Sequence, residues 1–178
     1  MTENDDSILV EQCLRGDRKA FEVIVEKYQK TIFNVALRIV NDYDDAQDVT
    51  LSSFVKAFEN LRSFDPKYKF FSWLYRIGVN ESLNFLNQKK SFEGLDDSLI
   101  SRDKGPEEAY HDLEQREDIR EALLRLKLDY RTVVVLKHFQ NLSYKEISYI
   151  LDLPEKTVKA RLFTARQFRR EILLKKGF

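Results

Sequence analysis

The chain has 178 residues and equal numbers of basic (30) and acidic (30) side chains, a length that suits one average domain or two small ones. Its single cysteine excludes a disulfide framework and a cysteine-based zinc site, and its two histidines lack the spacing of metal ligands. No stretch is long and apolar enough to span a membrane, and the acidic start differs from a signal peptide, so we expect a cytoplasmic protein without membrane insertion or cofactors.

The formal net charge of zero conceals a segregation of charge along the chain. Residues 1–60 carry 7 basic and 12 acidic groups, whereas residues 61–90 carry 6 and 2. Residues 91–121 carry 4 and 11, and residues 122–178 carry 13 and 5. Two basic blocks separated by an acidic one predict two contacts with nucleic acid.

Helical periodicity and low glycine and proline content (5 and 3) predict an all-α fold. We expect a short helix over 5–17 and a long amphipathic helix over about 18–40. An acidic turn then precedes a third helix that ends near Leu61, and Asp44 or Asp45 is well placed to cap it. Because the connections are short, these helices should pack as an antiparallel bundle.

The segment 61–90 interleaves aromatic residues with cations. Asp65-Pro66 interrupts the helical pattern, so residues 62–69 should form a loop before the next helix. Five residues of that helix share one stripe: Trp73, Arg76, Asn80, Asn84 and Asn87. An exposed row of this kind can stack on unpaired bases and hydrogen-bond their edges. The alternative is that the aromatic residues are core, which we favour for Phe70, Phe71 and Tyr75 but not for Trp73.

Residues 91–112 lose periodicity and collect carboxylates, which predicts a flexible acidic linker. Such a linker would discourage the isolated protein from binding DNA, and neutralising its carboxylates should raise duplex affinity. The helical pattern resumes near Leu113, and Asp129 can cap a further helix that stops near Asn141.

The most informative stretch runs from Ser143 to Arg170. Ser143 and Glu146 form a capping box, and Pro154 lies at or beside the start of a second helix. Each helix has a buried stripe: Ile147, Ile150 and Leu151 in the first, and Val158, Leu162 and Ala165 in the second. Two helices joined by so short a turn predict a helix-turn-helix.

The second of these helices is strongly basic. Residues 156–170 contain six cations and no carboxylate. The face opposite Val158 and Leu162 holds Lys156, Ala160, Phe163, Thr164 and Gln167. A small residue flanked by cations and a hydroxyl suits close approach to a major groove, although a solvated basic helix of another all-α protein is the alternative.

The order of these elements resembles bacterial sigma factors of the extracytoplasmic-function group, over about Ser7 to Leu174. Three signatures carry the resemblance: D-D-A-Q-D-V at 44–49, F-F-S-W-L-Y-R-I-G-V-N at 70–80, and L-S-Y-K-E-I-S-Y-I-L-D-L-P-E-K-T-V-K-A-R-L at 142–162. The resemblance implies two small helical bundles joined by a flexible acidic linker. A sigma region 2-like domain would span 5–90, the linker 91–112, and a region 4-like helix-turn-helix domain 113–176, without a further autoregulatory domain.

The resemblance also implies a function and its residues. The protein would bind core RNA polymerase, direct promoter-specific transcription initiation and associate with the nucleoid when bound to polymerase. Polymerase binding falls on Asp45, Asp48 and Phe54. Binding of single-stranded DNA in the −10 element falls on Arg62, Lys67, Tyr68, Lys69, Trp73, Arg76, Asn80 and Asn84. Duplex binding at the −35 element falls on Tyr144, Lys145, Lys156, Thr157, Lys159, Ala160, Arg161, Phe163, Thr164 and Arg166.

The chain departs from the family pattern at two places. Leu51-Ser52 stands where the family usually has Gln-Glu, and Asp152 stands at a turn position that is often Gly. An anti-sigma factor is an expected partner, since the family commonly has one. Two other classes remain: a stand-alone helix-turn-helix regulator, and a degenerate sigma-like interaction module. An enzyme is the least expected class, because the sequence offers no nucleophile, base or metal arrangement.

Overall fold

The computed structural model describes residues 3–93 and 113–175, and every regular element in these two ranges is a helix. The N-terminal part contains α1 (Glu3–Leu14), α2 (Arg18–Val40), α3 (Tyr43–Glu59), the short 3-10 helix η1 (Leu61–Ser63) and α4 (Phe70–Glu93). The C-terminal part contains α5 (Leu113–Leu124), α6 (Leu128–Val134), the π-helix η2 (Val135–Phe139), α7 (Tyr144–Leu151) and α8 (Glu155–Lys175). The all-α prediction is confirmed. The expected linker lies mostly outside the described residues.

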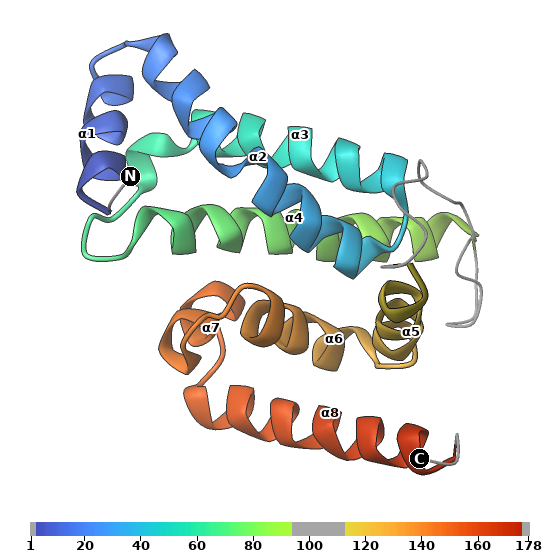
Figure 1. The fold of residues 1–178 in the computed structure, drawn as a ribbon. Helices are drawn as coiled ribbons and strands as arrows, with labels where there is room; N and C mark the ends of the chain where they lie inside the picture. Colours follow the sequence, from blue (N-terminus) through green and yellow to red (C-terminus); the bar gives the residue numbers. More distant parts are fainter. Residues whose placement is uncertain (1–2, 94–112, 176–178) are drawn as a thin grey trace.

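In the N-terminal part, α2, α3 and α4 pack against one another and α1 covers one end of this bundle (Figure 1). The close approach of α4 to α2 depends on Gly78, where a Cβ would lie 3.2 Å from Cγ2 of Ile32. The long helix predicted over 18–40 is confirmed with the same bounds.

The predicted cap of α3 is wrong by two or three residues. Asn41 ends α2 in the left-handed conformation (φ 62°), so Asp42 becomes the extended residue before α3. The Asp42 carboxylate accepts a hydrogen bond from the backbone N–H of Asp45, at 2.9 Å. Asp44 and Asp45 lie instead in the first helical turn, where the positive end of the helix dipole stabilises their negative charges.

The helix-turn-helix prediction is confirmed, except that Leu151 of the predicted α7 stripe is only half-buried. Both hydrogen bonds of the Ser143–Glu146 capping box are present, and Asp152 ends α7 with a φ of 53°. The three predicted stripe residues of α8 are buried: Val158, Leu162 and Ala165. The predicted cap at Asp129 is wrong, because α6 begins earlier and Asp129 lies in its first turn, 2.9 Å from Arg161 on α8.

The two layers of helices in Figure 1 pack directly against each other. Side chains of both parts belong to one continuous buried cluster, and α4 packs along α7. Polar contacts join the layers as well: the Arg131 guanidinium donates to the carbonyl of Ile39 at 3.0 Å, and Arg120 donates to Asn41 Oδ1 at 2.9 Å. The sequence did not predict whether the two parts are in contact.

Candidate nucleic-acid interface

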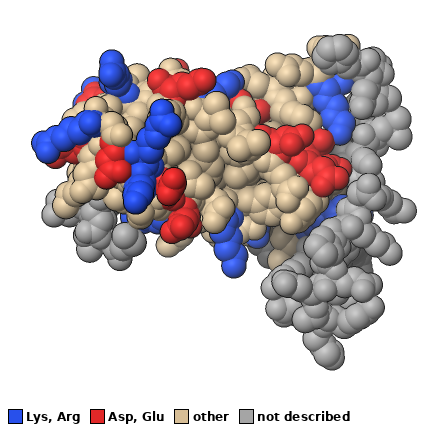
Figure 2. Space-filling model, turned by 90° about the horizontal axis from the view of Figure 1, so that it is seen from above, with Lys and Arg blue, Asp and Glu red and all other residues tan. Residues whose placement is uncertain are grey.

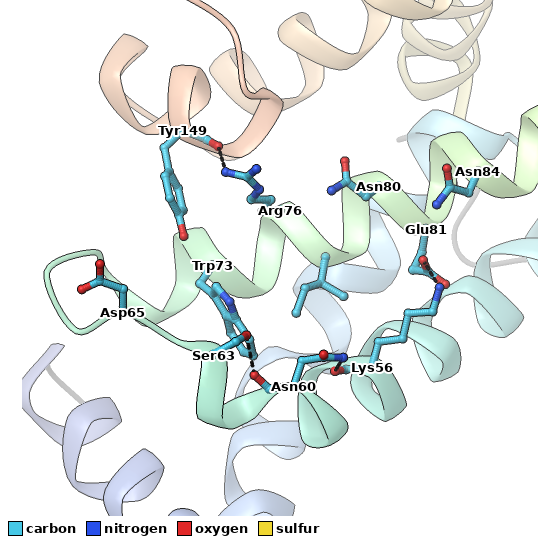
Figure 3. A pocket seen from close by; sticks show the side chains of 11 residues that line it. Lys56, Asn60, Ser63, Asp65, Trp73, Arg76, Asn80, Glu81, Asn84 and Tyr149 are labelled. Carbon is cyan, nitrogen blue, oxygen red and sulfur yellow. Dashed lines mark hydrogen bonds and ion pairs between the residues drawn. The ribbon is translucent and has the colours of Figure 1, made fainter.

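A pocket of about 450 Å³ lies between α3, the segment after it and α4, with α7 on its remaining side (Figure 3). Its lining combines amides, cations, carboxylates and one indole: Lys56, Asn60, Ser63, Asp65, Trp73, Arg76, Ile77, Asn80, Glu81, Asn84 and Tyr149. Four of the predicted single-strand residues meet here: Trp73, Arg76, Asn80 and Asn84. Such a lining can hydrogen-bond the edge of a flat heterocycle and hold it against apolar walls.

Hydrogen bonds fix the lower wall of the pocket, as drawn in Figure 3. Lys56 forms an ion pair with Glu81 at 2.6 Å, and the side-chain amide of Asn60 donates to the Lys56 carbonyl at 2.9 Å. The Ser63 hydroxyl donates to the carbonyl of Asn60 at 2.7 Å. Asn80 and Asn84 are exposed on the adjoining turns of α4, so their amide groups remain accessible to a bound molecule.

Trp73 is a wall of this pocket rather than part of an exposed row, which corrects the sequence prediction. Only 7% of Trp73 is exposed, and its ring lies 5.6 Å from the rings of both Phe64 and Phe70. Helical projection placed Trp73 on the side of the asparagines, but the loop after η1 folds back and puts Phe64 over it. The core interpretation of Phe70 and Tyr75 is confirmed, since both are buried.

The other predicted single-strand residues lie in η1 and in the loop that joins it to α4. Arg62 is in η1, Lys67, Tyr68 and Lys69 are in the loop, and all four are exposed. Hydrogen bonds from the side chain and the backbone N–H of Lys67 lower the pKa of Asp65, so this carboxylate stays ionised and ties the loop together. The predicted surface loop is confirmed for Lys67 and Lys69, whereas Arg62 is exposed in the short helix η1.

Three of the predicted single-strand residues are in contact with α7 and are therefore not surrounded by solvent alone. The ring of Tyr68 is stacked on that of Tyr149, with centroids 4.0 Å apart. Arg76 donates to the Tyr149 carbonyl at 3.1 Å and lies 3.6 Å from the Asp152 carboxylate. Lys69 pairs with Glu146 at 3.3 Å.

The predicted duplex-reading residues gather on the outer face of α8. Lys156, Lys159, Ala160 and Arg166 are exposed, and Phe163 is 63% exposed at the centre of this face. Thr157 and Thr164 are half-buried beside them, and Lys145 is exposed on α7. Lys159 Nζ lies 5.4 Å from the centre of the Tyr144 ring, which places that ring at the edge of the same surface.

Arg161 differs from the other cations of α8. Its guanidinium lies 2.9 Å from the Asp129 carboxylate, and three quarters of its side chain is covered. The structure therefore turns Arg161 toward the body of the domain and not onto the exposed face predicted to bind DNA. The helical projection alone had no information on the position of Asp129.

On α3, the three predicted polymerase-binding residues lie in different environments. Asp48 is exposed, whereas Asp45 pairs with Lys89 of α4 at 2.8 Å. Phe54 is only 6% exposed, so its side chain is part of the core of this structure and not of an exposed surface. Phe54 lies on the core side of α3 together with Val49 and Ala57, which are also buried.

The exposed side of α3 carries an apolar ridge that the sequence reasoning missed. Leu51 is 67% exposed, and Val55 and Phe58 are each 48% exposed. Their spacing of four and three residues aligns them on one face of the helix. The sequence reasoning counted Phe58 on the buried side of this helix, but Leu51 and Val55 already fall outside the stripe made by Val49, Phe54 and Ala57. Seen from above, the molecule shows a broad area without charged side chains between groups of charged residues (Figure 2).

Other kinds of site are missing from the part of the chain that the structure describes. Within residues 3–93 and 113–175, no cluster of three His, Cys, Asp or Glu residues could hold a metal ion. None of the described helices is both long and apolar enough to cross a membrane.

Comparisons with known proteins agree with the arrangement of these surfaces. Residues 24–92 match region 2 of the sigma-70 family, and residues 116–168 match its region 4. The chain is 34% identical to the RNA polymerase sigma-H factor of Pseudomonas aeruginosa, over 94% of this chain and 93% of that protein. It is also 34% identical to the ECF RNA polymerase sigma factor SigW of Bacillus subtilis, over 92% and 94%.

Two solved structures are similar to the whole fold. CnrH in complex with the cytosolic domain of CnrY has a TM-score of 0.74 and 25% sequence identity, over 98% of this chain and 99% of that chain. The sigma factor RpoE in complex with the anti-sigma factor NepR from Bartonella quintana also has a TM-score of 0.74, at 23% identity over 87% and 97%, and is similar in fold.

Proposed function

The chain belongs to the sigma-70 family as an extracytoplasmic-function sigma factor, which directs promoter-specific transcription initiation by RNA polymerase, and from this premise we propose how its surfaces divide the work. The domain over 5–90 docks on polymerase and captures the opened strand of the −10 element. The domain over 113–176 reads the −35 duplex. Neither domain performs a reaction of its own, and the protein acts in the cytoplasm, where its polymerase is.

The pocket beside α4 is the proposed site for an unpaired base. Its exposed amides at Asn80 and Asn84 supply both donors and acceptors for a base edge, and the indole of Trp73 supplies a rigid wall. Flipping a base costs a few kcal/mol, and stacking on an aromatic ring returns about 1–3 kcal/mol. The pocket can therefore hold an opened strand, while polymerase contacts and phosphate binding supply the remaining free energy.

The outer face of α8 is the proposed duplex reader. Phe163 and Ala160 form a small apolar area that can meet a thymine methyl group, and Lys156, Lys159 and Arg166 surround it. Cations in this position bind phosphates and set the register of the helix on the groove. Arg161 is left out of this surface, since its guanidinium is committed to Asp129.

The apolar ridge of α3, together with Asp48, is the proposed polymerase contact. Exposed apolar side chains aligned on one helix face are typical of a surface that packs against another protein. An anti-sigma factor is a further proposed partner. The similar structure of CnrH contains the cytosolic domain of CnrY.

One observation supports separate roles in strand capture and duplex reading: the asparagines of the pocket and the outer face of α8 lie on different domains and can be altered separately. We would assay in vitro transcription with core polymerase and a genomic promoter pool. Asn80→Ala should slow strand opening and leave initial promoter binding intact, because Asn80 lies at the pocket. Lys159→Ala should weaken promoter binding and reduce its salt dependence, so the difference from wild type should shrink as the salt concentration rises.

Matched controls with the same kind of side chain are available elsewhere on the protein. Gln88→Ala alters an exposed amide of α4 outside the pocket, and Lys30→Ala removes an exposed cation of α2; both should behave as wild type. Trp73→Ala is a poorer test, since truncating a buried aromatic residue costs about 3–5 kcal/mol of stability. Specific duplex binding by the protein alone, without binding to core polymerase, would favour a stand-alone regulator and contradict the proposal.

A further inference from the structure

We infer that the protein is self-occluded: in the free chain, α7 of the helix-turn-helix domain covers the single-strand DNA site of the N-terminal domain, with Tyr149 in the place of a DNA base. The inference rests on the function proposed above for that site. It adds a state of the free protein in which one of its two DNA-binding surfaces is closed and the other is open.

Tyr149 is held in the way that a stacked base would be held. Its ring is stacked on Tyr68, with centroids 4.0 Å apart and planes inclined by only 21°. The Arg76 guanidinium lies 5.3 Å from the centre of the same ring. Single-strand binding proteins hold bases through these two kinds of contact, aromatic stacking and an arginine over the ring. In Figure 3, Tyr149 extends from α7 toward the pocket, where it forms part of the lining.

Carboxylates of the same domain occupy the cations that a phosphate backbone would need. Arg76 lies 3.6 Å from Asp152, and Lys69 lies 3.3 Å from Glu146. Both carboxylates come from α7 or its C-terminal cap. Because a carboxylate and a phosphate compete for the same guanidinium or ammonium group, DNA must displace α7 before it can bind Arg76 and Lys69 fully.

Contacts away from the pocket keep the two domains in this arrangement. The Tyr75 hydroxyl donates to Gln140 Oε1 at 2.7 Å, and Arg38 lies 4.5 Å from the centre of the Phe139 ring. The buried core is continuous across the boundary between the domains. The outer face of α8, by contrast, lies on the side of the molecule away from α1–α4 (Figure 1). The occlusion is therefore selective for the single-strand site.

The first experiment measures binding of a fluorescent single-stranded DNA 12-mer of mixed sequence to the full-length free protein, by fluorescence anisotropy. Tyr149→Ala should tighten binding about tenfold, because it removes the stack that favours the closed state and raises the fraction that is open. Asp152→Asn should tighten binding about threefold, since it releases Arg76 and keeps a residue that tolerates a positive φ. Tyr149→Phe retains the ring and should match wild type.

Opening is measured independently of DNA through Trp73, the single tryptophan of the chain. Trp73 lines the pocket beside Tyr149, so Tyr149→Ala should increase quenching of its fluorescence by acrylamide. Unchanged quenching and unchanged DNA affinity in both Tyr149→Ala and Asp152→Asn would overturn the inference. Increased quenching without a gain in affinity would also overturn it, because the contact would then hold the domains together without covering the DNA site.

A double variant separates this inference from the function proposed for the pocket. If the gain in affinity arises at the pocket, adding Asn80→Ala to Tyr149→Ala should remove most of it, whereas adding Gln88→Ala, at an exposed amide outside the pocket, should not. A gain that persists in the Asn80 double variant would mean that DNA binds elsewhere on the opened protein. That result would contradict the proposed pocket, and with it self-occlusion of that pocket. Asp152→Asn, at an exposed position, provides the same comparison if Tyr149→Ala fails to fold.

Discussion

Arg131 is a buried arginine whose guanidinium hydrogen-bonds backbone carbonyls of both parts of the chain. It is 7% exposed, and its three guanidinium nitrogens donate to backbone carbonyls of Leu123, Leu124 and Leu126 at 3.1–3.4 Å, and of Ile39 at 3.0 Å. These carbonyls lie at or near the C-terminal ends of α5 and α2, where helices have unpaired acceptors and partial negative charge. Burial lowers the pKa of Arg131, yet an arginine remains charged at neutral pH.

Arg131→Met should therefore cost about 3 kcal/mol of unfolding free energy, because it leaves several buried carbonyls without donors. Urea denaturation followed by circular dichroism would measure the change. Arg125→Met is the matched control: Arg125 forms only an exposed pair with Glu121, and its loss should cost less than about 0.5 kcal/mol. Similar losses for the two variants would contradict this account of Arg131.

Glu146 links the capping box of α7 to Lys69 of the other domain. Partial burial alone would raise the pKa of the Glu146 carboxyl, but hydrogen bonds from the Ser143 hydroxyl and N–H and from Lys69 outweigh it and lower this pKa below 4.5. A carboxyl whose pKa is lower in the folded state stabilises the fold above its unfolded pKa. That stabilisation is lost as the pH falls through the folded-state value.

Comparison of wild type with Glu146→Gln should reveal this dependence. The difference in unfolding free energy should be largest near pH 7 and should shrink as the pH falls below about 4.5. Urea unfolding at a series of pH values would measure it. A difference of constant size down to about pH 3 would show that the carboxylate charge contributes nothing and that only the shape of the side chain matters.

At the scale of the element, the two faces of α3 have different roles. We expect the core face to contribute to stability and the exposed ridge to bind polymerase. Phe54→Ala, on the core face, should cost about 3–5 kcal/mol of unfolding free energy. It should leave the affinity of the folded fraction for core polymerase unchanged. Leu51→Ala, on the exposed ridge, should change stability by less than about 0.5 kcal/mol but weaken polymerase binding about fivefold or more. Paired measurements of urea unfolding and polymerase affinity would test both, and loss of polymerase affinity confined to Phe54→Ala would refute the ridge.

The features that were predicted correctly depend on interactions between residues that are close together in the sequence. The Ser143–Glu146 capping box, the left-handed Asp152 and the helix over 18–40 depend on residues within a few positions of one another, so the sequence contains them directly. The errors have non-local causes. Trp73 is buried because a loop folds back over it, and Arg161 turns inward because Asp129 of another helix lies beside it. Helical projection of a single segment has no access to such contacts.

At the scale of the whole molecule, the same limit applies to the arrangement of the domains. The periodic stripes of α7 and α8 predict what each helix buries, but the contacts of Tyr149 and Arg131 with α4 and α2 join residues 73 and 92 positions apart. Charge segregation predicted two nucleic-acid surfaces. It gave no indication that α7 would lie against one of them.

The α3 ridge is exposed in the closed arrangement, so DNA binding and polymerase binding are linked only if polymerase also needs the open form. If single-stranded DNA and core polymerase both bind only the open form, each apparent dissociation constant is divided by the fraction of molecules that is open. Tyr149→Ala should then raise the affinity for core polymerase by the same factor as the affinity for the 12-mer, about tenfold. Titration of amino-terminally labelled protein with core polymerase would measure it, with Tyr149→Phe as the control. A gain for DNA without a gain for polymerase would show that polymerase binds the closed form and opens it afterwards, so that the free energy of opening is supplied after docking.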